Sequence, residues 1–229
     1  MRTKALLGLA ALAVGLSSSV AQNVYSLNVV GYVNVPLAAN KLNFLSVPLI
    51  PSGGNFNITN SIVLDNSQDG ASIYSWAGTK WSPINPTWIG TDLGGTGWDT
   101  PMVISNGVGF FLASAGNSTL TFVGDVPQGA LPYTIPAGLS TFANQVPNGA
   151  NFPGAKVGND GDEMFTWDQA NQKWASAVWT FIGADLGGNG WDDGAADTNT
   201  NGPALAPAAA TFYVNGGNAI SFTQNFTVQ

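Results

Sequence analysis

Residues 91–100 read TDLGGTGWDT and residues 184–193 read ADLGGNGWDD, so the phrase DLGGxGWD occurs twice in the chain. Glycine allows left-handed backbone conformations, and an aspartate side chain can accept hydrogen bonds from nearby backbone N–H groups. The tryptophan that follows can then fold back over glycines that carry no side chain. The phrase therefore predicts a tight turn, made twice, with a tryptophan packed against it.

The repeat extends well beyond this phrase in both directions. Self-similarity at a fixed spacing indicates a repeat architecture, and about 100 residues is a usual size for a small domain. We therefore expect two repeat units, residues 22–126 and 127–229. The matched segments are Ile73–Trp76 with Met164–Trp167, Lys80-Trp81 with Lys173-Trp174, Gly109–Leu112 with Thr211–Val214, Leu120–Phe122 with Ile220–Phe222, and Gly54–Phe56 with Ala150–Phe152.

Short β-branched and aromatic runs in each unit are separated by Gly, Pro, Asn and Asp. This alternation is typical of antiparallel β-sandwiches and partly open barrels. No long segment has helical periodicity, and Ile58–Leu64 is the one stretch that resembles a helical turn. The sequence thus predicts an all-β fold of two tandem homologous antiparallel β-sandwich or partly open barrel units. The expected strands of the first unit are Val29–Val35, Phe44–Leu49, Ser72–Trp76, Gly109–Leu112 and Thr119–Val123.

The first 21 residues have the features of a secretory signal peptide. Arg2 and Lys4 precede an apolar run over residues 5–16, and the small residues Ser19 and Ala21 match a cleavage site. The run is too short for a membrane-spanning helix, which needs about 20 residues. We expect cleavage near Ala21, a secreted location that is extracellular, periplasmic or at the cell surface, and no integral membrane span.

Charge and composition exclude several classes of function. After residue 21 the chain keeps four lysines and no arginine against 13 acidic residues, which gives a net charge of −9. Such a chain lacks the basic patch that neutralises phosphates, so nucleic acid is not an expected partner. The chain also has no cysteine and no histidine. Disulfides, zinc sites and Ser-His-Asp catalysis are therefore excluded.

Catalysis by two carboxylates, as in glycosidases, is the enzyme chemistry that this composition leaves open. Glu163 is the only glutamate, the aspartates fall in turn sequences, and the chain after residue 21 has no arginine to hold a substrate. We therefore expect a protein that is not an enzyme.

Two longer phrases carry a resemblance to a protein family. Residues 135–152 read IPAGLSTFANQVPNGANF and residues 107–126 read GVGFFLASAGNSTLTFVGDV. Both resemble recurring phrases of secreted β-repeat proteins, without an assigned activity, from environmental Gram-negative-type bacteria. The chain departs from the usual GEGFF phrase at Val108, and has Ala210-Thr211-Phe212 in the second unit. The resemblance implies a secreted two-unit β protein and no catalytic residues.

The repeated DLGGxGWD phrase also has a functional interpretation. Tryptophan faces can stack on sugar rings, and aspartates can accept hydrogen bonds from sugar hydroxyl groups. The alternative is that each tryptophan only closes a glycine turn, and this alternative is the expected one. The candidate ligand-binding residues are Trp98, Trp191, Asp92, Asp99 and Asp185.

The second unit adds an acidic segment, DDGAADTNTNG at residues 192–202. Oxygen-bearing side chains at alternate positions before a glycine match the first half of a calcium loop. The bidentate Glu at the loop's twelfth position is replaced by Ala208, so a solvated acidic loop is the alternative. Two shorter acidic segments, residues 65–70 and 159–163, are interpreted as plain turns. The candidate calcium ligands are Asp192, Asp193, Asp197, Asn199 and Asn201.

These observations predict a non-catalytic, secreted structural or adhesive protein of the cell surface or extracellular matrix. The alternative is a carbohydrate-binding module, with or without a dependence on calcium. The expected partners are polysaccharide or other surface proteins, and Ca²⁺ is the one cofactor that the residue types favour.

Overall fold

The computed structural model describes residues 29–154, 156–195 and 201–228, and the predicted signal peptide lies outside them. The fold is all-β, as predicted, and its antiparallel sheets do not close into a barrel. Among the described residues, no helix has the length and apolar character needed to cross a membrane. The strands are β1 Val30–Leu37, β2 Lys41–Ser46, β3 Ser72–Ser75, β4 Trp88–Ile89, β5 Gly97–Trp98, β6 Gly109–Ser114, β7 Ser118–Asp125, β8 Gly129–Ile135, β9 Gly138–Ala143, β10 Ala150–Asn151, β11 Glu163–Asp168, β12 Lys173–Ile182, β13 Gly190–Asp192, β14 Ala204–Leu205, β15 Ala210–Asn215 and β16 Ile220–Phe226.

The helical content is confined to single turns. The α-helix α2, Ile58–Ser61, begins at Asn57, whose side chain accepts a hydrogen bond from the N–H of Thr59. Asparagine at this position satisfies an N–H group that the first turn of a helix leaves without a partner. The 3₁₀ turns are η1 Ser52–Gly54, η2 Asn66–Gln68, η3 Thr91–Leu93 and η4 Ala184–Leu186.

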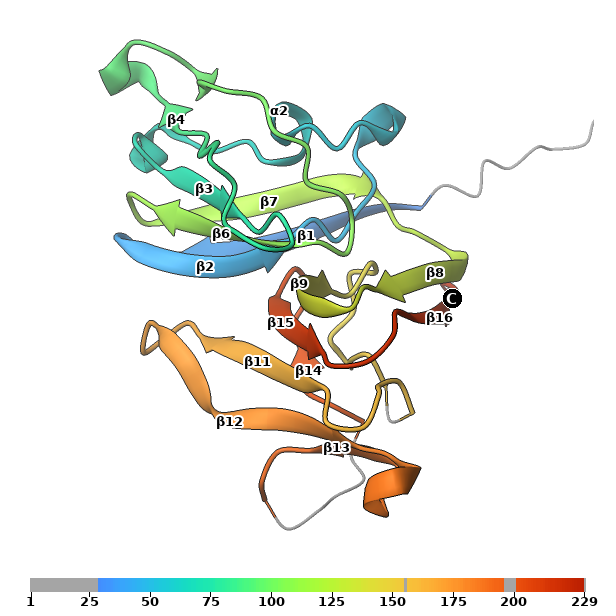
Figure 1. Cartoon of the computed structure of the whole chain (residues 1–229). Helices are drawn as coiled ribbons and strands as arrows, with labels where there is room; N and C mark the ends of the chain where they lie inside the picture. The colour runs from blue at the N-terminus through green and yellow to red at the C-terminus, as the bar shows by residue number, and fades with distance from the viewer. Residues whose placement is uncertain (1–28, 155, 196–200, 229) are drawn as a thin grey trace, which may run out of the picture.

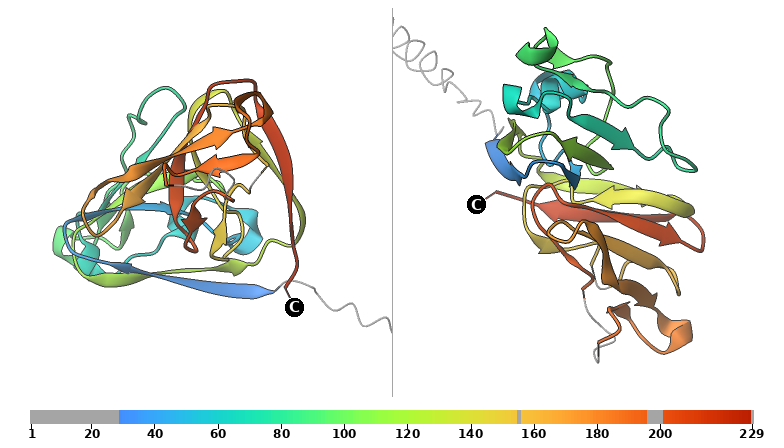
Figure 2. Two further views of the ribbon diagram at one scale, coloured as in Figure 1. Left: turned by 90° about the horizontal axis from the view of Figure 1, so that it is seen from below. Right: turned by 90° about the vertical axis from the view of Figure 1, so that its left-hand side faces the viewer.

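Strand pairing follows one pattern in both halves of the chain. In residues 30–125, β1 pairs with β7, β6 lies between β2 and β3, and β4 pairs with β5. In residues 129–226, β8 pairs with β16, β15 lies between β9 and β11, and β12 pairs with β13. Figure 1 shows the two halves one above the other, and the right-hand view of Figure 2 shows the same division. That the halves are homologous units divided near residue 126 stays a prediction.

The pairing register corrects the sequence alignment of the two halves by one residue. Tyr74 pairs with Phe111 and Phe165 pairs with Phe212, so Phe111 and Phe212 are equivalent. The segment Gly109–Leu112 therefore corresponds to residues 210–213 and not to residues 211–214. The sequence alignment matched Phe110-Phe111 with Phe212-Tyr213 because both pairs are aromatic. In the structure, pairing with the neighbouring strand sets the register.

Strands β1, β3, β6 and β7 lie where the sequence predicts them, but β2 begins at Lys41 and not at Phe44. It ends at Ser46, although Val47 and Leu49 are buried in the core. Pro48 lies between them and has no N–H group to donate to a neighbouring strand. Residues 47 and 49 are therefore buried without belonging to the strand. A hydrophobic run in the sequence indicates burial but does not show where strand pairing ends.

Each half has its own hydrophobic core, and a third cluster joins them. The first core includes Ile58, Phe110 and Leu120, and the second includes Trp191 and Tyr213. The joining cluster consists of Phe44, Phe111, Ala143, Ala210 and Phe212, with Trp76, Leu139, Phe165 and Trp167 packed against it. An apolar junction with aromatic rings from both halves fixes the halves to each other.

Backbone hydrogen bonds cross the junction in equivalent places. The N–H of Ser46 in β2 donates to the C=O of Ala208 at 2.8 Å, and the N–H of Ala143 in β9 donates to the C=O of Gly107 at 3.0 Å. Both acceptor residues have positive φ angles, 63° at Ala208 and 79° at Gly107. In each half, a residue with a positive φ angle thus presents its C=O group to a strand of the other half.

Candidate functional site

The two DLGG segments form equivalent turns, as the repeat predicts. Each is a 3₁₀ turn followed by a left-handed glycine, Gly94 after η3 and Gly187 after η4. The Asp69 carboxylate accepts hydrogen bonds from the N–H groups of Gly90 and Leu93, both at 2.9 Å. The Asp160 carboxylate holds η4 by accepting hydrogen bonds from the N–H groups of Gly183 and Asp185. The two short acidic segments, residues 65–70 and 159–163, therefore each supply a carboxylate that stabilises a DLGG turn.

The tryptophans of the repeated phrase pack within their own halves. Trp191 is 0% exposed and makes edge contacts with Phe181 and Tyr213. Trp98 is half-buried against Trp88, and its indole N–H donates to the C=O of Ile62 at 2.7 Å. The second core surrounds Trp191, so neither face of its indole ring is open to a ligand. Trp191 is therefore not part of the sugar-binding site proposed below.

The candidate aspartates of the phrase do not converge on one point. Asp92 and Asp185 are exposed in η3 and η4. The Asp99 carboxylate accepts a hydrogen bond from the N–H of Thr87 at 2.8 Å, which joins the residue before β4 to the residue after β5. Over residues 29–154, 156–195 and 201–228, no group of three or more acidic side chains is placed to hold a metal ion.

The predicted calcium loop lies partly outside the described residues, since Asp197 and Asn199 fall in the gap at residues 196–200. The carboxylates of Asp192 and Asp193 accept hydrogen bonds from the N–H groups of Gly194 and Ala195, at 2.8 and 2.9 Å. Asn201 is exposed. Calcium binding here stays a prediction.

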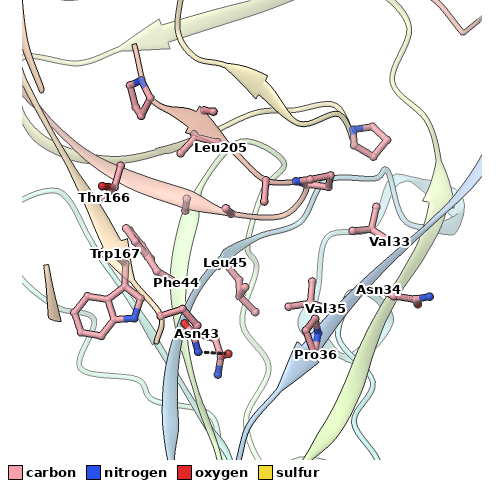
Figure 3. Close-up of a pocket in the computed structure, with 18 of the residues that line it drawn as sticks. Val33, Asn34, Val35, Pro36, Asn43, Phe44, Leu45, Thr166, Trp167 and Leu205 are labelled. Carbon is pink, nitrogen blue, oxygen red and sulfur yellow. Dashed lines mark hydrogen bonds between the residues drawn. The ribbon is translucent and has the colours of Figure 1, made fainter. Parts of the chain in front are cut away.

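A groove of about 830 Å³ runs between the two halves and is here called the first groove. In Figure 3, Val33, Asn34, Val35 and Pro36 of β1 lie along one side. Thr166 and Trp167 of β11 lie along the other side, with Phe44 and Leu45 of β2 between them. The remaining lining residues are Tyr32, Asn43, Pro147, Gln169, Trp179, Pro203, Ala204, Leu205, Ala206, Pro207, Ala209 and Ala210.

The lining of the first groove is polar but uncharged. None of the described residues that line it is Asp, Glu, Lys or Arg, although the chain carries 13 acidic residues. The Gln169 amide N–H donates to the Asn43 side-chain oxygen at 2.7 Å, and the Trp167 indole N–H donates to the C=O of Leu42 at 3.0 Å. Both bonds run from the second half to the first half, so they hold the two sides of the groove together.

Several polar side-chain atoms of the lining have no hydrogen-bond partner within the part of the chain that the structure describes, and three of them stand beside the ring surface. These three are the indole nitrogen of Trp179, the side-chain oxygen of Gln169 and the hydroxyl of Tyr32. The Tyr32 side chain is 71% exposed. The groove therefore offers a ring face, an N–H donor and oxygen acceptors to a ligand that carries no charge.

Two half-exposed tryptophans lie beside the junction. Trp81 is 44% exposed and Trp174 is 40% exposed, and both rings contact Phe111 and Phe212 at centroid distances of 5.5 to 6.0 Å. We call the set Trp76, Trp81, Trp167 and Trp174 the aromatic crest. The sequence shows these tryptophans as repeat matches only, and their gathering at one site depends on the packing of the two halves.

The chain matches no protein-family model, no curated protein and no solved structure.

Proposed function

We propose that the chain is a non-catalytic, secreted adhesive protein that binds uncharged polysaccharide in the first groove. The observation that carries the proposal is the lining of this groove. Trp167, Trp179 and Tyr32 supply aromatic surface, Asn43 and Gln169 supply amide groups, and the described lining has no ionised side chain. The sequence features of residues 1–21 support secretion.

Uncharged sugars fit such a lining for a physical reason. A pyranose ring has an apolar face that packs on an aromatic ring, and its hydroxyl groups both donate and accept hydrogen bonds. The atoms of Trp179, Gln169 and Tyr32 that lack protein partners match those two needs. A charged ligand would lose its hydration in the groove without gaining an ion pair.

A binding role for the groove is supported by the way the halves are joined. The junction buries stacked rings, with Phe44 and Phe111 at a centroid distance of 4.4 Å, and hydrogen bonds cross it. Such a junction makes the groove a preformed surface, and a preformed surface loses less conformational freedom when it binds a stiff polymer. An adhesive protein needs the groove only to bind the polysaccharide.

Affinity electrophoresis tests the proposal with a soluble β-glucan, a xylan and a mannan as neutral ligands, and alginate as an anionic one. We expect retardation by at least one neutral polysaccharide, reduced at least about tenfold in affinity by Tyr32→Ala or Gln169→Ala. Both side chains are exposed, so neither change should unfold the chain. Tyr74→Ala is the matched control, because Tyr74 is 37% exposed and does not line the groove. Binding that none of the groove changes affects would contradict the proposed site.

A second candidate function is a structural component that associates with other surface proteins. The outer face of the β1–β7 ribbon favours it, because Val30, Tyr32 and Val123 are 54%, 71% and 48% exposed there. Such a face buries apolar area when a partner covers it. Light scattering tests self-association, and Val123→Lys should shift any oligomer toward monomer.

A further inference from the structure

A smaller groove of about 300 Å³ lies on the junction at a place equivalent to the first groove. We call it the second groove. The first groove has β1, β2 and Trp167 in its wall, and the second has the equivalent strands β8 and β9 together with Trp76. The equivalence follows from the pairing, since Trp76 forms a β-bridge with Trp81 and Trp167 pairs with Trp174.

The second groove also has an uncharged polar lining. Thr134, Ser140, Thr141, Asn106 and Gln145 line it, and no acidic or basic side chain does so within the described residues. The hydroxyl of Tyr133 at its base is occupied, because it accepts a hydrogen bond from the N–H of Gln145 and donates to Gln224. The two grooves thus offer the same chemistry to a ligand, aromatic surface with amide and hydroxyl groups.

The aromatic crest lies between the two grooves as two pairs of tryptophans. Trp167 lines the first groove and contacts Trp174 at a centroid distance of 5.1 Å. Trp76 lines the second groove and contacts Trp81 at 5.3 Å. Trp81 and Trp174 both rest on Phe111, at 5.9 and 6.0 Å. Ring contacts therefore run from one groove to the other, with the buried ring of Phe111 between the two exposed rings of Trp81 and Trp174.

Each crest tryptophan that lines a groove is fixed by the opposite half of the chain. The indole N–H of Trp76 donates to the C=O of Leu139, and the indole N–H of Trp167 donates to the C=O of Leu42, both at 3.0 Å. Trp81 and Trp174 have no such hydrogen bond within the described part of the chain and keep two-fifths of their surface open. The crest thus has two anchored ends and two accessible central rings.

We propose that one extended chain of an uncharged polysaccharide occupies both grooves and crosses the crest, where Trp81 and Trp174 each bind a sugar ring. The proposal rests on the proposed function and adds the ligand's length, because it assigns a polymer and not a short oligosaccharide. Sugar units that bind at linked sites combine their binding free energies, so their affinities multiply, since each later contact is made within the same complex. Affinity should then rise steeply with chain length.

Exposed lysines lie next to the crest, Lys80 before Trp81 and Lys173 before Trp174. They are the only basic residues next to it in sequence, and each groove lining is uncharged. An acidic polysaccharide could pair with the lysines but not with the grooves, so the uncharged polymer is the ligand that suits the whole path. Alginate and a salt titration separate these cases.

Calorimetry on the full secreted chain tests the proposal with size-graded oligosaccharides cut from whichever of the β-glucan, xylan or mannan it binds. We expect affinity to rise at least about 100-fold from the shortest binding oligosaccharide to the polymer. Trp81→Ala with Trp174→Ala should remove most of this rise and leave the affinity for the shortest oligosaccharide unchanged. The dependence of affinity on oligosaccharide length is measured on the unaltered protein, so this part of the test does not depend on whether a variant folds.

The outcomes separate the two proposals. If short and long chains bind the unaltered protein equally well, the extended path is wrong and the first groove stands alone. If the length dependence survives the loss of both crest tryptophans, the crest is not part of the path. If alginate alone binds, and salt abolishes that binding, both the uncharged ligand and the path are wrong. If no oligosaccharide or polymer binds, the proposed function itself fails.

Discussion

Gly109 and Ala210 meet at the centre of the junction, where a Cβ added to Gly109 would lie 2.8 Å from the Cβ of Ala210. The same atom would lie 3.0 Å from Phe44 and 3.1 Å from the Cβ of Thr141. These two residues are equivalent in strands β6 and β15, so the halves meet here at a contact between two small residues.

Gly109→Ala should therefore destabilise the protein by about 1–3 kcal/mol, because a tightly packed contact cannot accept another methyl group without displacement. Adding Ala210→Gly should restore at least about 1 kcal/mol, since it removes the opposing methyl group. Urea denaturation of the two single variants and the double variant measures this coupling. Independent, additive effects would show that the two residues do not meet.

The Asp69 carboxylate should matter for stability because it holds the first DLGG turn by two backbone N–H groups. Asp69→Ala leaves both groups without their acceptor and should cost about 1–3 kcal/mol. Asp92→Ala is the matched control, because Asp92 is exposed within the same turn, and it should change stability by less than about 0.5 kcal/mol. Equal thermal shifts for the two variants would argue against the support assigned to Asp69.

The sequence predicts the strands and turns whose conformation depends on residues close together in the sequence. Alternating β-branched and aromatic residues locate β1, β3, β6 and β7, and the repeated phrase predicts the equivalent turns with Trp98 and Trp191 packed against them. These features follow from local backbone preference and from burial of one strand face. Local signals also explain why the two-residue strands β4 and β5 were not expected, since so short a run has no pattern.

The candidate site could not be predicted in the same way. The first groove joins β1 and β2 to β11 and β14, and the Trp167 indole reaches Leu42 across 125 positions of sequence. Such contacts depend on how two finished halves pack, and a single sequence contains no signal for that packing. Trp98 and Trp191, which the sequence offered as candidate ligand contacts, are half-buried and buried, whereas Trp81 and Trp174, which it treated as repeat matches, remain exposed.

Trp191→Ala should cost about 3–5 kcal/mol, because the indole is 0% exposed and packs against Phe181 and Tyr213. Trp81→Ala removes the same side chain from a half-exposed place and should cost distinctly less. Thermal and urea denaturation measure both changes. Unaltered stability of Trp191→Ala together with loss of polysaccharide binding would make this tryptophan a ligand contact after all.

If a metal ion binds, we expect calcium in the acidic segment, with weak affinity because the twelfth-position carboxylate is missing. Extracellular calcium sites of this kind have dissociation constants of roughly 10⁻⁴–10⁻³ M. Calorimetry should show binding that Asp197→Ala abolishes, with little change in global stability, since the segment is an insertion in the second half. A lack of heat at several millimolar calcium would identify the segment as a solvated acidic loop.

Alkaline pH should unfold the protein through Tyr213. Burial raises the pKa of this phenol well above its usual range, and the hydrogen bond to the Asp162 carboxylate, at 2.7 Å, together with the charge of Asp162, raises it further. Burial also raises the pKa of Tyr133, against a lowering by the hydrogen bond from Gln145. Both phenols are therefore held neutral in the folded protein at a pH where they ionise in the unfolded chain.

The sign of the pH dependence follows from this difference. The unfolded chain binds fewer protons than the folded protein once the pH exceeds about 10, the usual tyrosine pKa, so the free energy of unfolding falls as pH rises further. Each such phenol lowers it by up to about 1.4 kcal/mol per pH unit. Tyr213→Phe should cost about 1.5–3 kcal/mol at pH 7, because the buried Asp162 loses a donor, and should make the decline above pH 10 shallower. Tyr32→Phe, at a 71% exposed position, should leave both quantities unchanged. Urea denaturation from pH 7 to pH 11.5 measures them, and an equal decline in the unaltered and Tyr213→Phe proteins would show that this buried phenol does not govern the alkaline transition.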